Sequence, residues 1–214
     1  MQVNLCDNKT NFNGIKLQTI QTPLKKIDIY SLDSRDKNFL KHLSDLLQNT
    51  ALPPDTVKIG NKTPKQITLN ALHKASVTAK SDYTSKVLIS VENDKNITGI
   101  LNTELEGDMT IKGMAAWGDK DAKQGLLSSI LKETQKFQDT SLIIPIENVT
   151  GKMEALCKRF GFKKPKDDPS IYTIDPIDMK KVFRRLKILS KNDVKEYKNK
   201  PFVDLEKKLL DTNA

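Results

Sequence analysis

The stretch from Ser141 to Phe162, SLIIPIENVTGKMEALCKRFGF, limits the possible folds of this chain more than any other part of it. It opens with Leu142–Ile146, an apolar run of buried-strand length, and then turns at Glu147 and Asn148. Apolar residues follow at the i, i+3, i+4 and i+7 spacing of an amphipathic helix: Met153, Leu156, Cys157 and Phe160. Glycine commonly ends helices, so Gly161 is expected to stop this helix, and a new strand is expected to start at Phe162.

The remaining chain alternates between strand and helix patterns. The expected elements are, in order, a strand at Ile27–Tyr30, a helix carrying Phe39 to Leu47, a helix starting at Thr63, strands at Val87–Val91, Ile97–Leu105 and Met109–Trp117, a helix carrying Leu126 to Phe137, the Ser141–Phe162 unit, and a strand at Ser170–Ile174. The polar cluster Asn93–Asn96 separates the first two of the three central strands and predicts a hairpin turn.

This order of elements, with Asn148 after a strand and Gly161-Phe162 after a short helix, resembles the GNAT (Gcn5-related N-acetyltransferase) acyltransferases over roughly Ile27 to Ile174. The resemblance implies an α/β (α+β) fold with a mixed, mostly antiparallel central sheet flanked by helices. The chain departs from the family pattern at Cys157, where the family helix carries a Tyr. The spacing from Asn148 to Gly161 is also longer than usual.

The resemblance further implies an acyl-CoA site between two strands that splay apart, here Met109–Trp117 and Leu142–Ile146. The pantetheine arm of acetyl-CoA or another acyl-CoA would insert there and pair with main-chain groups, as an added strand does. Pro145 is compatible with a splayed edge, where a missing N–H costs little. The residues implied in cofactor binding are Met114, Ala115, Ala116, Trp117, Lys120, Lys123, Gln124, Gly125 and Asn148.

The cofactor pyrophosphate would lie at the N-terminus of the helix that follows the third central strand. In the family, glycines there let the backbone approach the phosphates, but this chain has Asp121 and Lys123 at the expected positions. Lys120 and Lys123 could replace the amide donors by charge. The alternative is an ordinary helix start capped by Asp119 or Asp121.

For acyl transfer, an amine must lose a proton, attack the thioester carbonyl and expel the CoA thiolate. The candidate bases are Glu104, Asp119 and Glu147. Cys157 stands where the resemblance implies the acid that protonates the leaving sulfur, and a thiol of ordinary pKa, about 8.5, is mostly protonated at neutral pH. The alternative is a buried structural cysteine on the apolar helix face.

The composition excludes several other classes of protein. The chain has 214 residues, and no apolar run approaches the roughly 18–20 residues that span a bilayer. The N-terminus lacks the pattern of a secretory signal, and Cys6 and Cys157 have no metal-type spacing. We therefore expect a cytoplasmic protein without a metal or membrane partner, as a monomer or homodimer.

Three segments are expected: a loosely ordered leader at 1–25, a GNAT-like acyltransferase domain at 26–175 and a basic helical C-terminal extension at 176–214. The extension carries eleven Lys and Arg against six Asp and Glu, and the whole chain has a net charge of +9. Two functions stay open. One is an acyl-CoA-dependent N-acyltransferase, with acetyl as the expected group, acting on an unknown primary amine by direct attack. The other is a catalytically inactive GNAT-like domain that binds a nucleic acid or an acidic protein through the basic helices.

Overall fold

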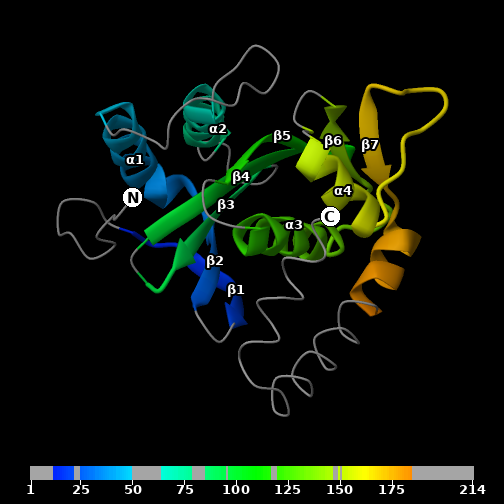
Figure 1. Cartoon of the computed structure of the whole chain (residues 1–214), viewed down its shortest axis with the longest axis horizontal. Helices are drawn as coiled ribbons and strands as arrows, with labels where there is room; N and C mark the ends of the chain where they lie inside the picture. The colour runs from blue at the N-terminus through cyan, green and yellow to red at the C-terminus, as the bar shows by residue number, and fades with distance from the viewer. Residues whose placement is uncertain are drawn as a thin grey trace. The chain divides into compact units, whose positions relative to one another are not determined.

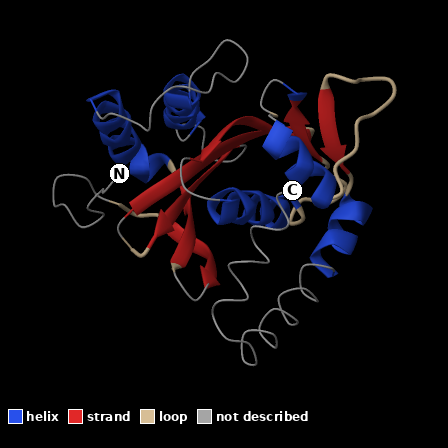
Figure 2. Ribbon diagram, in the orientation of Figure 1, coloured by secondary structure: helices blue, strands red, loops and turns tan. Residues whose placement is uncertain are grey.

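In the part of the chain that the structure describes, seven strands form one sheet, and their spatial order equals their order in the sequence (Figure 1). The strands are β1 (Ile15–Gln21), β2 (Lys26–Leu32), β3 (Ser85–Glu92), β4 (Asn96–Glu106), β5 (Asp108–Ala116), β6 (Leu142–Pro145) and β7 (Ile171–Ile174). Every neighbouring pair is antiparallel except β5 and β6, which are parallel. The expected fold class, a mixed and mostly antiparallel sheet flanked by helices, is confirmed (Figure 2).

This computed structural model describes residues 12–21, 25–49, 64–78, 85–94, 96–116, 120–146, 149 and 151–184. The chain divides into two compact units, residues 1–176 and 177–214. All strands and helices labelled here belong to the first unit. Of the second unit, residues 177–184 are described, and they are helical. The rest of the basic extension, residues 185–214, lies outside the described residues, so its binding role stays a prediction.

Helices cover both faces of the sheet. They are η1 (Ser34–Asp36, a short 3-10 helix), α1 (Lys37–Asn49), α2 (Pro64–Thr78), α3 (Lys120–Thr134) and α4 (Gly151–Arg159). On one face, α1 and α2 bury a core that includes Phe39, Leu43, Leu72, Ile89 and Ile100. On the other face, α3 contacts β1 to β5. Both faces of β3 and β4 are therefore buried, which explains why adjacent residues in these strands are both apolar.

Strand β1 lies inside the segment that was expected to be a loosely ordered leader, so the sheet begins earlier than predicted. The register between β1 and β2 shifts between Lys16 and Gln18, which marks a bulge. A bulge breaks the alternation of apolar and polar residues by which strands are recognised in a sequence. Asp28 on β2 is buried, and its carboxylate accepts hydrogen bonds from Lys16 Nζ and Thr19 Oγ1 of β1.

The predicted hairpin turn between β3 and β4 is confirmed. Asn93 and Asp94 have φ angles of 51° and 61°, the left-handed conformation that a tight hairpin turn requires. Asn93 Oδ1 also accepts the backbone N–H of Lys26 at 3.0 Å, which ties the turn to the start of β2. Among the described helices, none is long and apolar enough to cross a membrane.

Candidate active site

The strands β5 and β6 pair only near their first residues, Met109 with Leu142 and Thr110 with Ile143. The Met109 N–H donates to the Ser141 carbonyl oxygen at 2.9 Å, which fixes the point where the strands meet. Among the described residues, the in-register pairs between β5 and β6 end at Thr110, although β5 stays paired with β4 as far as Ala116. We call the opening between residues 112–116 of β5 and residues 144–145 of β6 the fork.

Pro145 lies on the inner edge of the fork. The Ile146 N–H donates to the Ser170 carbonyl oxygen at 2.8 Å, so it points away from β5, toward the segment that pairs with β6. Successive peptide groups of a strand point to opposite sides, so the nitrogen of Pro145 faces β5. Its missing N–H therefore falls in the fork, where it removes no hydrogen bond to β7. This agrees with the interpretation of Pro145 as a splayed-edge residue.

Three of the predicted cofactor contacts, Met114, Ala115 and Ala116, lie along the fork. On their other side they pair with Leu101, Ile100 and Gly99 of β4. In the described structure no strand pairs with these three residues on the side of β6. An extended ligand could therefore pair with this edge of β5. Trp117, Asp119 and Asn148 lie outside the described residues.

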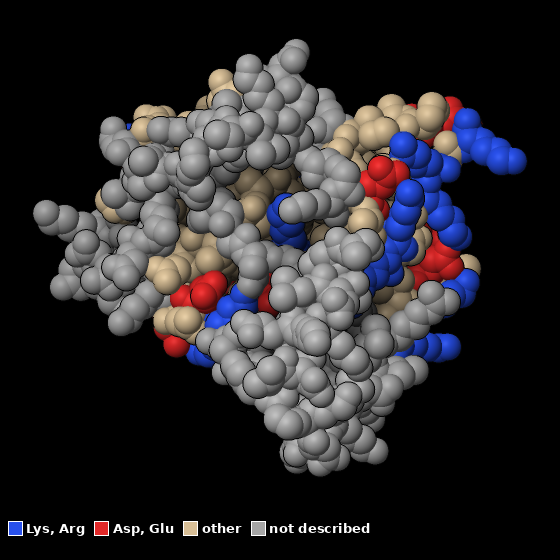
Figure 3. All heavy atoms as spheres, viewed as in Figure 1, with Lys and Arg blue, Asp and Glu red and all other residues tan. Residues whose placement is uncertain are grey.

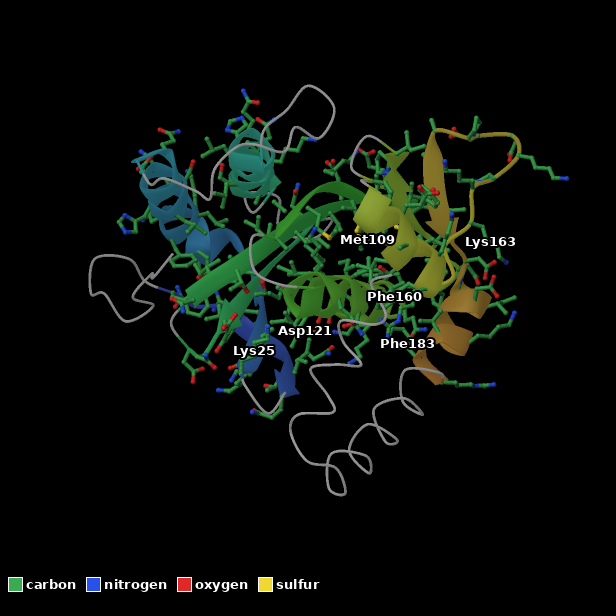
Figure 4. All side chains as sticks on the ribbon, viewed as in Figure 1. Lys25, Met109, Asp121, Phe160, Lys163 and Phe183 are labelled. Carbon is green, nitrogen blue, oxygen red and sulfur yellow. The ribbon has the colours of Figure 1, made fainter. Side chains whose placement is uncertain are left out.

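The N-terminus of α3 follows the C-terminal end of β5 in the chain. Asp121 lies in its first turn, and its Oδ2 is 3.6 Å from Lys25 Nζ, which comes from the residue before β2 (Figure 4). Both side chains are mostly buried. Lys25 thus offsets a negative charge that would otherwise oppose a phosphate here. Sequence patterns missed Lys25 because it lies far from α3 in the chain.

Lys123 is half-buried near the same helix start, and the side chain of Lys120 is outside the described set. Gln124 and Gly125 lie further into the helix. A Cβ added to Gly125 would lie 2.6 Å from Ile20 Cδ1 and 3.0 Å from Ile29 Cδ1. Gly125 therefore allows α3 to approach β1 and β2 closely. The close packing of α3 on these two strands explains why a glycine stands at position 125. The predicted contact of Gly125 with the cofactor stays a prediction.

Cys157 lies on the buried face of α4, where its side chain is 0% exposed. Met153 and Phe160 are buried beside it, as the helical spacing predicts. Burial, with a smaller effect of the Glu154 carboxylate, raises the pKa of the Cys157 thiol to about 12. The thiol therefore keeps its proton at neutral pH, as an acid requires, but it has no solvent-exposed surface. Its catalytic role stays a prediction.

The end of α4 follows the prediction for Gly161. This residue has a φ of 79°, its N–H donates to the Lys158 carbonyl oxygen, and the Phe162 N–H donates to the Cys157 carbonyl oxygen. This pair of hydrogen bonds is the Schellman arrangement that ends a helix. It directs the chain away from α4 into the segment that leads back to β7.

Tyr172 on β7 is a proton-bearing side chain that sequence patterns did not single out. It is buried, and it lies opposite Ile144 of β6. Burial and a hydrogen bond with Glu154 raise the pKa of its hydroxyl group, and the negative charge of the Glu154 carboxylate adds to this shift. Glu154 and Lys158 form an ion pair at 3.1 Å.

On the face of the described surface that Figure 3 shows, cationic and anionic side chains lie next to one another.

The candidate base Glu104 lies close to the narrow end of the fork. It pairs in register with Thr110, the last residue of β5 that is paired with β6. Lys112 Nζ lies 3.4 Å from Glu104 Oε2 and 3.4 Å from Glu106 Oε2. The structure therefore places Glu104 one strand away from the narrow end of the fork, next to a cation and a second carboxylate.

A bulge in β5 adjoins this charged group. Thr103 pairs with Ile111 and Asn102 pairs with Gly113, so Lys112 is the extra residue. The carbonyl oxygen of Lys112 accepts a hydrogen bond from Lys74 Nζ of α2 at 2.6 Å. No sequence pattern indicates Lys74, because its partner is a main-chain atom of a distant strand. Among the described residues, no group of three His, Cys, Asp or Glu side chains could hold a metal ion.

No protein-family model matches the chain, and no curated protein matches its sequence. Solved structures share parts of the fold. A spermidine N-acetyltransferase from Vibrio cholerae, in complex with CoA and spermine, is 12% identical with a TM-score of 0.42, over 72% of this chain and 97% of that chain. An acetyltransferase of the GNAT family from Staphylococcus aureus Mu50 is 16% identical with a TM-score of 0.39, over 70% and 99%.

A KacTA–DNA complex also matches, at 13% identity and a TM-score of 0.39, over 53% of this chain and 82% of that chain. At such identities and scores, these likenesses carry no argument about activity, substrate or partner.

Proposed function

We propose that this chain is an acyl-CoA-dependent N-acyltransferase that transfers an acyl group, expected to be acetyl, to a primary amine. The observation that carries the proposal is the fork, where β5 continues to Ala116 after its pairing with β6 has ended at Thr110. Main-chain groups along such an edge can bind an extended ligand as they would bind another strand. The pantetheine arm of CoA is extended and carries amide groups, so it suits this opening.

The place of α3 gives the proposed cofactor a direction. Helix N-termini bind phosphate groups through main-chain N–H groups and the helix dipole. The start of α3 would hold the pyrophosphate, with Lys25, Lys120 and Lys123 as cationic partners. The arm would then run along β5 from Ala116 to Lys112, about 13 Å at the usual rise per residue. The thioester would lie at the narrow end of the fork.

Glu104 is then the proposed base, because it lies across β5 from the narrow end of the fork. It would take a proton from the acceptor amine, directly or through water. The amine attacks the thioester carbon, and a main-chain N–H of β5 stabilises the oxyanion. The carbon–sulfur bond breaks, and the thiolate takes up a proton. Cys157 stays the predicted donor, and Tyr172 is a second one.

Thermal unfolding with CoA and acetyl-CoA tests the proposal. Ligand at one hundred times its dissociation constant stabilises the native state by about 2.7 kcal/mol, which should raise the melting temperature by a few degrees. Lys25→Met should weaken binding of CoA, because Asp121 then opposes the phosphates. Lys136→Met is the matched control, since Lys136 forms an ion pair with Glu133 just beyond the other end of α3. The absence of saturable binding at millimolar ligand would refute the proposal.

A further inference from the structure

We propose that Lys74 is an acyl acceptor within its own chain, so that the protein acylates Lys74 at the fork. This inference rests on the proposed function, since it requires an acyl-CoA in the fork. It adds a modification site and names the class of acceptor as a lysine ε-amine. The observation behind it is the hydrogen bond from Lys74 Nζ to the Lys112 carbonyl oxygen at 2.6 Å.

This hydrogen bond brings an amine from the helical layer to the edge strand of the fork. Helix α2 packs on β4 and β5 (Figure 1). Lys112 lies two residues beyond Thr110, where the pairing of β5 with β6 ends. The bulge makes Lys112 the extra residue of β5. The ε-amine of Lys74 therefore contacts the residue of β5 that borders the narrow end of the fork, where the thioester is proposed to lie.

The contact also restricts the motion of the amine. A free lysine side chain samples many rotamers, whereas a nucleophile held near its target reacts as part of a unimolecular step. A neutral Lys74 amine can donate one N–H to the Lys112 carbonyl and keep its lone pair for attack. Glu104, whose Oε2 lies 3.4 Å from Lys112 Nζ, is the base proposed above and would accept the released proton, directly or through water.

The reaction is balanced without a further reactant. The Lys74 amine loses one proton and attacks the carbonyl carbon of acyl-CoA, which forms a carbon–nitrogen bond. The carbon–sulfur bond then breaks, and the sulfur leaves with its electron pair and takes up a proton. The products are an amide at Lys74 and free CoA. The amide has no positive charge, so acylation would also change the charge around Lys112.

The experiment is incubation of the full chain with acetyl-CoA, followed by intact mass and peptide mapping over time. Wild-type protein should gain one acetyl group at Lys74 at least tenfold faster than at Lys41, an exposed lysine of the neighbouring helix α1. The first-order rate should not change when the protein is diluted tenfold at saturating acetyl-CoA. Lys74→Arg should abolish this fast phase, whereas Lys41→Arg should leave it unchanged.

The outcomes separate this inference from the proposed function. Arginine keeps the charge and the donor to Lys112, so an unchanged melting temperature and acetyl-CoA affinity in Lys74→Arg would show that the fold and the site are intact. Acetyl-CoA binding with labelling spread over exposed lysines, or with a rate proportional to protein concentration, would overturn the inference and leave the proposed function standing. Absence of acetyl-CoA binding would overturn both.

Discussion

Replacement of Asp28 by asparagine tests how strand β1 is attached to the sheet. The Asp28 carboxylate is 1% exposed, and its Oδ2 lies 2.8 Å from Lys16 Nζ and 3.0 Å from Lys26 Nζ. Burial alone would raise the pKa of Asp28, but hydrogen bonds from Lys16, Thr19 and Lys26 outweigh it and lower the pKa from 3.8 to about 2. Asparagine keeps the shape of the side chain and removes the charge.

The expected magnitude follows from this shift. Each pKa unit corresponds to 1.36 kcal/mol, so ionised Asp28 should stabilise the fold by about 2 kcal/mol at neutral pH. Because the folded-state pKa is the lower one, this contribution is complete well above pH 3.8 and is lost as the pH falls toward 2. At pH 3 about half of it should remain. Protonated Asp28 is uncharged, as is the asparagine that replaces it in the variant, so the two proteins should converge in acid.

The assay is the free energy of unfolding from urea denaturation at pH 7 and pH 3. Asp28→Asn should lower it by about 2 kcal/mol at pH 7 and by about 1 kcal/mol at pH 3. Asp94→Asn is the matched control, because Asp94 also pairs with Lys26 but is 61% exposed. Its effect should stay below about 1 kcal/mol. An equal effect of Asp28→Asn at both pH values would refute the electrostatic reasoning.

Two further predictions concern the candidate catalytic residues. Glu104→Gln should lower kcat at least tenfold without weakening acetyl-CoA binding. The control is Glu106→Gln, which removes the other carboxylate partner of Lys112 and should retain activity. Equal losses of kcat in the two variants would exclude Glu104 as the base. In a Cys6→Ser background, a thiol reagent at pH 8 should leave Cys157 unlabelled until denaturant is added, because the thiol is buried and its pKa is raised to about 12. Rapid labelling of the folded protein would show that Cys157 is accessible.

The sequence predicted those elements whose signals are local. The helix face of Met153, Cys157 and Phe160 depends on a spacing of a few residues, and the end of α4 depends on one glycine. Both are confirmed. The turn at Asn93 and Asp94 was also predictable, because these residues tolerate positive φ angles. The order of the other strands was expected from the resemblance to the GNAT acyltransferases and not from the spacing of apolar residues.

Features set by distant contacts were not predictable in this way. The bulge in β1 hid a strand, since it shifts the alternation of its side chains. Gly125 stood near a phosphate-loop pattern, but the space it provides is defined by Ile20 and Ile29 of two other elements. Lys25 and Lys74 contact partners that no sequence pattern links to them. Each of these features depends on which elements lie side by side in the folded chain, and a local sequence pattern does not show this.

The fork also bears on how the protein behaves in solution without ligand. Polar main-chain groups along an open strand edge can pair with a strand of another molecule, which is a common start of aggregation. Pro145 limits this hazard on the β6 side, because it has no N–H to offer. Residues 114–116 of β5 have no such protection in the described structure. A ligand bound in the fork would therefore also protect this strand edge from pairing with another molecule. Storage of the protein with CoA should suppress its self-association.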